Sequence, residues 1–144
     1  TSRIYDRNGA LLYELINEGR REEVPLDRIP FAMRQATIAT EDDTFYDNPG
    51  FDPPSIARAA TQWISEGEIV TGGSTITQQL IRQIVFSYEE RNQQTLRRKA
   101  KEIALAWVMT QQYSKDDILA LYLNEVYYGN LAYGVEAAAQ TYFG

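Results

Sequence analysis

The chain has 144 residues, which suffice for one domain with a hydrophobic core but not for two ordinary domains. Its composition, 44% hydrophobic and 24% charged, is typical of a globular domain and excludes a disordered chain. The net charge of −6 argues against a nucleic-acid partner, and the lack of cysteine and histidine excludes disulfides, thiolate nucleophiles, imidazole bases and histidine-ligated metals.

The N-terminal part of the chain predicts a small β-hairpin followed by a helix. Residues 3–15 place apolar runs on both sides of Asn8 and Gly9, a pair that hairpin turns favour. A charged loop over residues 17–23 then leads to a proline-flanked helix start. We expect the helix itself over residues 30–40.

Three acidic residues follow this helix. Glu41 comes after the last turn, where the negative end of the helix dipole and the neighbouring Asp42 disfavour a further negative charge. A carboxylate in this setting is a readier proton acceptor and suits a general base. The run from Glu41 to Asp43 is equally typical of a solvated acidic turn, and residue chemistry alone favours that second interpretation.

A one-faced helix is predicted over residues 54–66, with Ile56, Trp63 and Ile64 on its apolar side and Gly67 at its end. Trp63 suits either a membrane interface or an ordinary core stripe.

The segment GGSTITQQL, residues 72–80, joins a glycine turn to a helix that opens with hydroxyls and carries two adjacent amides. Helix N-termini expose unpaired N–H groups and partial positive charge, which suit phosphate or sugar oxygens. Two stripes follow at helical spacing. The expected buried stripe is Thr77, Leu80, Ile81, Ile84 and Val85, and the polar stripe, either substrate-binding or simply solvated, is Thr75, Gln78, Gln79 and Arg82.

A long helix is predicted over residues 96–112, after a polar connection over residues 87–95. Glu102 lies where the helix turns from basic to apolar, and the run 103–109 is apolar on every side, which predicts burial. Cations three and four positions earlier can hold this carboxylate ionised, although a salt bridge at the core margin explains the same pattern. The basic residues near this position are Arg91, Arg97, Arg98, Lys99 and Lys101.

Two further helices complete the prediction. Ser114 and Asp117 form a capping box for a helix over residues 116–127, and a last helix is expected over residues 135–143. The sequence therefore predicts a mainly α fold, organised as a single domain over residues 1–144 with a short N-terminal β-hairpin.

Five segments in order match the motifs of one enzyme family. Residues 41–50, EDDTFYDNPG, resemble EDxxFxxHxG, and residues 72–79, GGSTITQQ, match GxSTxTQQ. Residues 98–102, RKAKE, fit RKxxE, residues 115–124, KDDILALYLN, fit KxxILxxYLN, and residues 129–143 resemble the fifth motif. The chain therefore resembles, over nearly its whole length, the peptidoglycan glycosyltransferase domain of bifunctional penicillin-binding proteins and monofunctional peptidoglycan polymerases, glycosyltransferase family 51.

The resemblance implies a lysozyme-like helical fold with a small mobile lobe against the membrane. It implies polymerisation of lipid II into β-1,4-linked glycan strands, with inversion and release of undecaprenyl pyrophosphate, on the extracytoplasmic face of the bacterial cell membrane. The motif match makes Glu41 the general base and Glu102 the second family carboxylate, which assists at the acceptor or positions the donor's pyrophosphate. Moenomycin-like phosphoglycolipids are implied as ligands.

The resemblance also implies roles for the remaining motif residues, because a leaving pyrophosphate needs concentrated positive charge. Asn48 replaces the histidine usual in the first motif and keeps a hydrogen-bonding side chain that cannot titrate. The expected substrate-binding residues are Ser74, Thr75, Gln78, Gln79, Arg82, Arg91, Arg98, Lys99 and Lys101. The expected motif-supporting residues are Asp42, Phe45, Asn48, Gly50, Lys115 and Asn124.

The implied partners are lipid II, the nascent glycan strand and the membrane surface, with an anchoring segment outside this chain. Family domains continue through more helices after the fifth motif, so we expect the domain to be truncated at its C-terminal end. A C-terminal transpeptidase domain in the full-length protein stays open, as does a divalent cation, Mg or Mn, at the pyrophosphate. No acidic cluster in the sequence requires a metal, so no metal site is predicted.

Two alternatives remain. A lysozyme-like glycan hydrolase would use the same fold and the same two carboxylates, although it has no need of five clustered cations. The second alternative is that this chain is a non-catalytic fragment of the family domain that binds lipid II without polymerising it.

Overall fold

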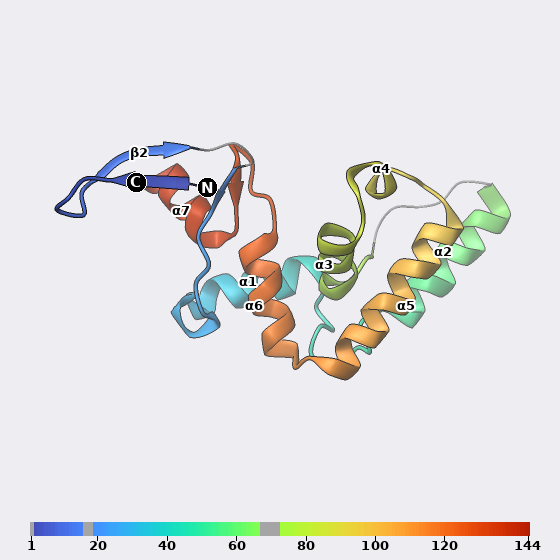
Figure 1. Ribbon diagram of the computed structural model, residues 1–144. Helices are drawn as coiled ribbons and strands as arrows, with labels where there is room; N and C mark the ends of the chain where they lie inside the picture. Colours follow the sequence, from blue (N-terminus) through green and yellow to red (C-terminus); the bar gives the residue numbers. More distant parts are fainter. Residues whose placement is uncertain (1, 16–18, 67–72) are drawn as a thin grey trace.

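The computed structural model describes residues 2–15, 19–66 and 73–144. Within these ranges the protein is mainly helical with short strands, which confirms the predicted fold class. Figure 1 shows an elongated molecule in which a β-hairpin projects at one end and helices α2 and α5 form the other. The elements are β1 (Ser2–Tyr5), β2 (Leu11–Leu15), β3 (Arg20–Arg21), the 3-10 helix η1 (Leu26–Arg28), α1 (Phe31–Glu41), α2 (Pro53–Glu66), α3 (Ile76–Val85), α4 (Tyr88–Arg91), α5 (Leu96–Gln112), α6 (Lys115–Glu125), β4 (Ala132–Tyr133) and α7 (Val135–Phe143).

The predicted hairpin is confirmed. Strands β1 and β2 pair antiparallel, and the turn between them is closed by Asp6, whose Oδ1 accepts 2.8 Å hydrogen bonds from the N–H groups of Asn8 and Ala10. Gly9 adopts a φ of +85°, a conformation that glycine reaches without strain. The turn residues therefore determine where the chain reverses.

A second small sheet was not predicted. Strand β3 pairs parallel with β4, with Arg20 opposite Ala132, so residues expected to lie in a charged loop bridge to the C-terminal part of the chain. Each strand has only two residues, too few for any periodic pattern in the sequence.

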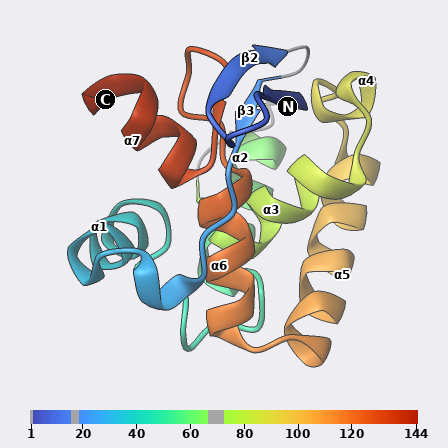
Figure 2. The ribbon, with the colours of Figure 1, turned by 60° about the vertical axis from the view of Figure 1, so that its left-hand side comes forward.

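Helix α3 lies at the centre of the core. It packs against α5 and α6, and Figure 2 shows it between them. Leu80 from α3 and Leu119 from α6 are fully buried in this core, together with Phe45 from the loop after α1. Burying an aliphatic side chain of this size contributes about 1.5–3 kcal/mol, so the helix that carries the second motif is firmly anchored.

The predicted buried stripe of α3 is correct at its start and wrong at its end. Thr77, Leu80 and Ile81 are buried, but Ile84 and Val85 are 49% and 46% exposed. The helix ends at Val85, and the next residue, Phe86, turns into the core instead. The first residue after the helix thus takes the core position that was expected for the residues of the last helical turn.

Helix α5 has the bounds predicted from the sequence, but the run 103–109 is not buried on every side. Glu102, Ala106 and Met109 form a buried stripe, whereas Trp107 and Val108 are substantially exposed. The helix lies at the surface and packs on α3 through one face, so an apolar run alone overstated its burial.

Other boundaries differ by small amounts. Helix α1 includes Glu41 as its last residue, and α6 ends at Glu125 rather than at residue 127. Helix α4 is a single turn, capped by Ser87 and Glu90, inside the predicted polar connection.

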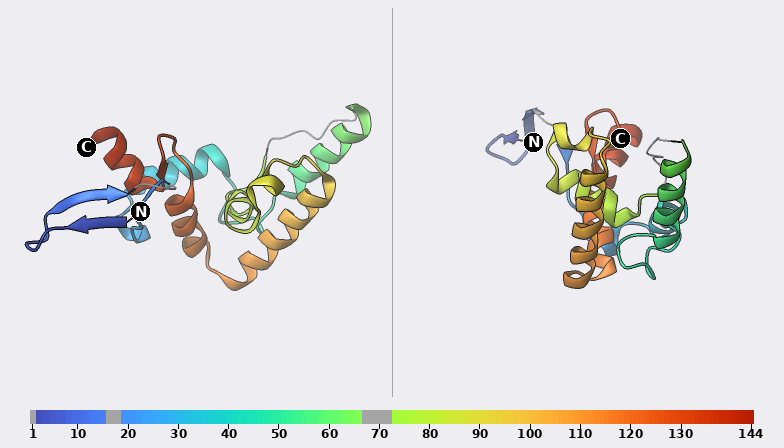
Figure 3. Two further views of the ribbon diagram at one scale, coloured as in Figure 1. Left: turned by 45° about the horizontal axis from the view of Figure 1, so that its top comes forward. Right: turned by 90° about the vertical axis from the view of Figure 1, so that its right-hand side faces the viewer.

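Helix α2 confirms the predicted second helix, and the right-hand view of Figure 3 shows it standing apart from α5. The side chain of Trp63 lies outside the described residues, as do Gly67 and Gly72. Gly73 is described and has a φ of +80°, so the turn before α3 uses a glycine conformation.

Candidate active site

Glu41 ends helix α1 with its side chain exposed. Its Oε2 accepts a 2.9 Å hydrogen bond from Nε2 of Gln79 on α3. The helix stops here because Asp42 leaves helical geometry, with φ −165°, while its N–H still donates to the carbonyl oxygen of Ile38. Glu41 is therefore both oriented by a neighbouring helix and accessible to a ligand, as a general base must be.

A buried polar network centred on Asp42 holds the loop after α1. Asn48 Nδ2 donates to both oxygens of Asp42, at 2.9 and 3.1 Å, and the N–H of Ile76 donates to Oδ2 at 3.1 Å. Lys115 Nζ donates to the carbonyl oxygen of Asn48 at 2.7 Å and lies 4.8 Å from the centre of the Phe45 ring. These hydrogen bonds connect the loop that follows Glu41 to α3 and to α6.

Asn48 serves this network as an acceptor too. Its Oδ1 accepts from the N–H of Gly50 at 2.9 Å and from Lys115 Nζ at 3.2 Å. Gly50 has a φ of +98°, and a Cβ there would lie 2.5 Å from the carbonyl oxygen of Ala106, so the loop can press against α5 only with glycine. The asparagine at the position of the family histidine thus makes contacts that support the loop.

Replacing Asn48 with alanine is expected to lower the free energy of unfolding by about 2–3 kcal/mol. The Asp42 carboxylate and the Lys115 ammonium would each lose a buried partner, and unpaired buried polar groups are costly. Denaturant unfolding measures the change. Asn92→Ala is the matched control, because Asn92 is exposed and, within the described residues, its side chain makes one hydrogen bond, to the carbonyl oxygen of Tyr88. Equal effects of the two substitutions would contradict the importance of this network.

The N-terminus of α3 is closed by a capping box. The N–H of Gln78 donates to Thr75 Oγ1 at 3.2 Å, and the N–H of Thr75 donates to Gln78 Oε1 at 3.0 Å. Thr75 Oγ1 donates in turn to the carbonyl oxygen of Gly50 at 2.7 Å. Both side chains are buried, which corrects the expectation of an open polar stripe: its accessible members are Gln79 and Arg82.

Glu102 is fully buried and surrounded by cations. Its Oε2 lies 2.6 Å from Nη1 of Arg98 and its Oε1 lies 2.7 Å from Nζ of Lys99, the residues four and three positions earlier on α5. Arg82 reaches the same carboxylate from α3, with Nε 3.8 Å from Oε2. We call Arg82, Arg98 and Lys99 the cation cluster. Three positive charges against one negative charge leave two in excess.

Two predicted members do not join the cation cluster. Arg91 Nε donates to the carbonyl oxygen of Phe86 at 2.9 Å, so this side chain caps the C-terminal end of α3. Lys101 Nζ pairs with Glu90 at 3.6 Å and lies over the Phe86 ring. Successive residues of a helix point about 100° apart, so Lys101 faces a different side from Glu102. In the described residues neither side chain contacts Glu102, and their roles at the pyrophosphate stay predictions.

Asn124 lies on α6 and braces the segment before η1. Its Nδ2 donates to the carbonyl oxygen of Val24 at 2.9 Å, and the N–H of Val24 donates to its Oδ1 at 2.9 Å. These paired bonds imitate a strand pairing and hold the N-terminal segment against α6.

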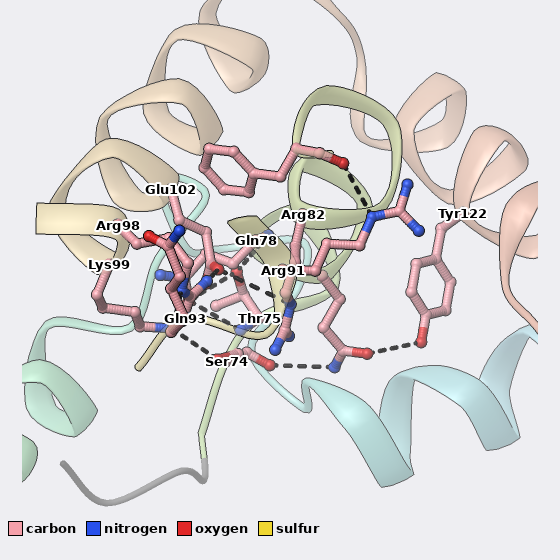
Figure 4. A network of polar contacts seen from close by, with 12 residues as sticks. Ser74, Thr75, Gln78, Arg82, Arg91, Gln93, Arg98, Lys99, Glu102 and Tyr122 are labelled. Atoms are coloured by element: carbon pink, nitrogen blue, oxygen red, sulfur yellow. Dashed lines mark hydrogen bonds and ion pairs between the residues drawn. The ribbon is translucent and has the colours of Figure 1, made fainter. Parts of the chain in front are cut away.

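Ser74 connects the two carboxylates. Lys99 Nζ, which also holds Glu102, donates to Ser74 Oγ at 2.7 Å. Gln79 Nε2, which also holds Glu41, donates to the carbonyl oxygen of Ser74 at 3.2 Å. Figure 4 shows Arg98, Lys99 and Glu102 together on one side of Ser74. A polar cavity of about 330 Å³ is lined by residues that include Glu41, Asp52, Ser55, Arg58 and Ser74.

Sequence reasoning missed Tyr122. This buried residue of α6 donates its hydroxyl to Gln79 Oε1 at 3.1 Å. Burial raises the pKa of Tyr122, and the charge of Glu41 raises it further. The available signal was its position three and four residues after Leu119 and Ile118, on the buried stripe of the helix, because a buried tyrosine hydroxyl needs a partner.

Sequence reasoning also missed the cavity wall at α2. Asp52 caps this helix, with the N–H of Ser55 donating to its Oδ2 at 3.2 Å, and Arg58 donates to Ser55 Oγ at 2.6 Å. Arg58 is largely exposed and supplies positive charge to the cavity. An Asp followed by prolines at the start of a helix is a capping pattern, but it does not reveal which cavity the helix lines.

Within the described ranges, no group of three or more acidic side chains is arranged to hold a metal ion. Asp42, at the edge of the cavity, is already bonded by Asn48 and by the N–H of Ile76. The carboxylates present therefore do not fit a protein-held divalent cation, and we assign it no step. None of the helices in the described part of the chain combines the length and hydropathy that a membrane span requires.

Comparisons of the sequence with known proteins point to one family. The model of the family described as "Transglycosylase" matches residues 8–144. Penicillin-binding protein 1A of Escherichia coli (strain K12) is 50% identical over 141 residues, 98% of this chain and 16% of that protein. Penicillin-binding protein 1A of Aquifex aeolicus (strain VF5) is 46% identical over 143 residues, and penicillin-binding protein 1A/1B of Bacillus subtilis (strain 168) is 42% identical over 144. The chain spans 15–19% of the length of these relatives.

Proposed function

This chain belongs to the transglycosylase family, and from that premise we propose that it polymerises lipid II into β-1,4-linked glycan strands of peptidoglycan. Membership makes it a peptidoglycan glycosyltransferase domain with a lysozyme-like helical fold. The observation that carries the finer proposal is the continuous polar connection from Glu41 through Gln79, Ser74 and Lys99 to Glu102. This connection supports the proposal because it links the candidate proton acceptor, Glu41, to the cation cluster.

Glu41 is the general base of the proposed reaction. It removes the proton of the acceptor's GlcNAc 4-hydroxyl, and the oxygen attacks the anomeric carbon of the growing chain's MurNAc. The bond from that carbon to undecaprenyl pyrophosphate breaks on the opposite face, so the configuration inverts to a β link. An exposed, oriented carboxylate beside a polar cavity supports this role, because proton transfer needs the base within hydrogen-bond reach of the acceptor.

The cation cluster stabilises the leaving pyrophosphate. Charge develops on the phosphate oxygens as the bond breaks, and guanidinium and ammonium groups positioned beforehand stabilise it most strongly. Glu102 keeps Arg98 and Lys99 in place, which makes it a positioning carboxylate for the donor rather than a second base. In the described part of the chain no three acidic side chains are grouped to hold a divalent cation, so no step is assigned to one.

The cellular setting follows from the substrate. A lipid-linked donor restricts the enzyme to a membrane surface, and we propose the extracytoplasmic face of the bacterial cell membrane, with anchoring by a segment outside this chain. Because the chain spans less than a fifth of its relatives, a transpeptidase domain in the full-length protein is part of the same proposal.

Incubation with lipid II in detergent, followed by sizing of the glycan product, tests the function. We expect glycan strands much longer than a disaccharide, with release of undecaprenyl pyrophosphate. Cleavage of polymeric glycan without use of lipid II would identify a hydrolase instead. Binding of lipid II without any product would identify a binding module, and either result would refute the proposal.

A further inference from the structure

The side-chain amide of Gln79 is at the centre of the site. Its Nε2 donates to Glu41 Oε2 at 2.9 Å and to the carbonyl oxygen of Ser74 at 3.2 Å, and its Oε1 accepts from the hydroxyl of Tyr122 at 3.1 Å. The Gln79 side chain therefore links the C-terminal end of α1, the residues just before α3 and helix α6.

These partners determine which way the amide points. Glu41 and the Ser74 carbonyl are both acceptors, so they use both hydrogens of the NH₂ group, and the amide oxygen must face Tyr122. A carboxylate and a carbonyl cannot donate, so the reversed amide would place its oxygen against two other oxygens. The tyrosine hydroxyl consequently donates its proton to Gln79.

We propose that Tyr122 is a positioning residue that fixes Gln79, and through it Glu41, for proton transfer. This inference rests on the proposed role of Glu41 as the base. With Oε2 held by Gln79, Oε1 of Glu41 has no hydrogen-bond partner in the described part of the chain. Oε1 is thus the oxygen that accepts the proton of the acceptor hydroxyl.

The surroundings of Tyr122 suit this role. The residue is 5% exposed, and its helix packs directly against α3, so the ring cannot move without disturbing the core. Burial and the Glu41 charge both raise the pKa of Tyr122, so the hydroxyl keeps its proton and stays a donor. Figure 4 shows Arg98 and Lys99 on one side of Ser74 and Tyr122 on the other. The Tyr122 hydroxyl contacts Gln79, which holds Glu41, while the charge of Arg82 partly offsets the rise in the pKa of Tyr122.

Tyr122→Phe removes the hydroxyl and keeps the buried ring. We expect kcat of the full-length protein with lipid II to fall by about 10- to 100-fold, because small misplacements of a catalytic group have effects of this size. KM should stay within about threefold, since the contact is to the base and not to the substrate. Tyr142→Phe is the control: it also removes one hydroxyl hydrogen bond, to the backbone carbonyl oxygen of Tyr128, and in the described residues Tyr142 makes no hydrogen bond to Glu41 or Gln79.

A double-mutant cycle separates positioning from a general effect on folding. If Tyr122 acts through Gln79, then Tyr122→Phe should change kcat by less than about twofold in a Gln79→Leu background. Equal losses in both backgrounds, or an unchanged kcat of the single variant, would overturn the proposal. Should Tyr122→Phe fail to fold, Gln79→Leu tests the same contact: a normal kcat for that variant would overturn the proposal, and a reduced kcat at unchanged KM would support it.

Crystal structures of the native protein and of Tyr122→Phe provide a readout that does not depend on turnover. We expect the Gln79 amide, left with two of its three hydrogen bonds, to become less well ordered and the Glu41 side chain to lose its single orientation in the variant. An unchanged Gln79–Glu41 contact would overturn the positioning role even if the enzyme polymerises lipid II. If the variant shows the expected change but the native protein does not polymerise lipid II, the positioning role would be supported and the proposed function refuted.

Discussion

Replacing Glu41 with glutamine is expected to reduce polymerisation of lipid II by about 100-fold or more, since general bases contribute 10²- to 10⁴-fold in typical enzymes. The amide has the same shape but cannot accept the proton of the acceptor hydroxyl. The fold should be retained, because Glu41 is exposed at a helix end and its side chain makes one hydrogen bond within the described residues. Initial rates with lipid II measure the loss, and thermal unfolding measures the fold.

Glu89→Gln is the matched control, because Glu89 is an exposed glutamate on α4 that has no contact with either carboxylate of the site in the described residues. Its rate should equal that of the native protein. A well-folded Glu41→Gln variant with near-normal turnover would remove Glu41 from the role of base.

Replacing Glu102 with glutamine is expected to act mainly on stability, lowering the free energy of unfolding by about 3 kcal/mol. Removing one partner of a buried ion pair leaves uncompensated buried charge, and here two close cations and Arg82 lose their counter-charge. Denaturant unfolding measures the effect. Turnover of the folded fraction should fall less than in Glu41→Gln, and the reverse order would exchange the two roles.

Glu90→Gln is the control for this second prediction. Glu90 also pairs with a lysine, Lys101, but at 3.6 Å and with both side chains exposed, where solvent screens the interaction. The substitution should leave stability nearly unchanged. A Glu102→Gln variant as stable as Glu90→Gln would mean that the cation cluster does not depend on Glu102.

Local signals predicted most helices. Ser114 and Asp117 form the capping box expected from their spacing, and the last helix has the predicted bounds. Signals that depend on distant partners failed, because β3 is a strand only through its pairing with β4. The exposure of Ile84 had the same cause: helical periodicity shows which residues share a face, but not where the packed neighbour ends.

The site was predictable where one helix builds it. The placement of Arg98 and Lys99 beside Glu102 follows from spacings of four and three residues on α5. Closeness in sequence was misleading for Lys101, which points to another side of the same helix. Tyr122 is part of the fourth motif, but its contact with Gln79 depends on the packing of α6 on α3, which the motif does not specify.

The central claim is that the cation cluster receives the leaving pyrophosphate while Glu41 faces the acceptor across Ser74. A crystal structure of the protein with a bound, non-reactive lipid-linked donor tests it most directly. We predict phosphate oxygens within ion-pair distance of Arg98 and Lys99, and the anomeric carbon on the Glu41 side of Ser74. Phosphates bound at Arg58 in the polar cavity, with the cation cluster left closed on Glu102, would contradict the account.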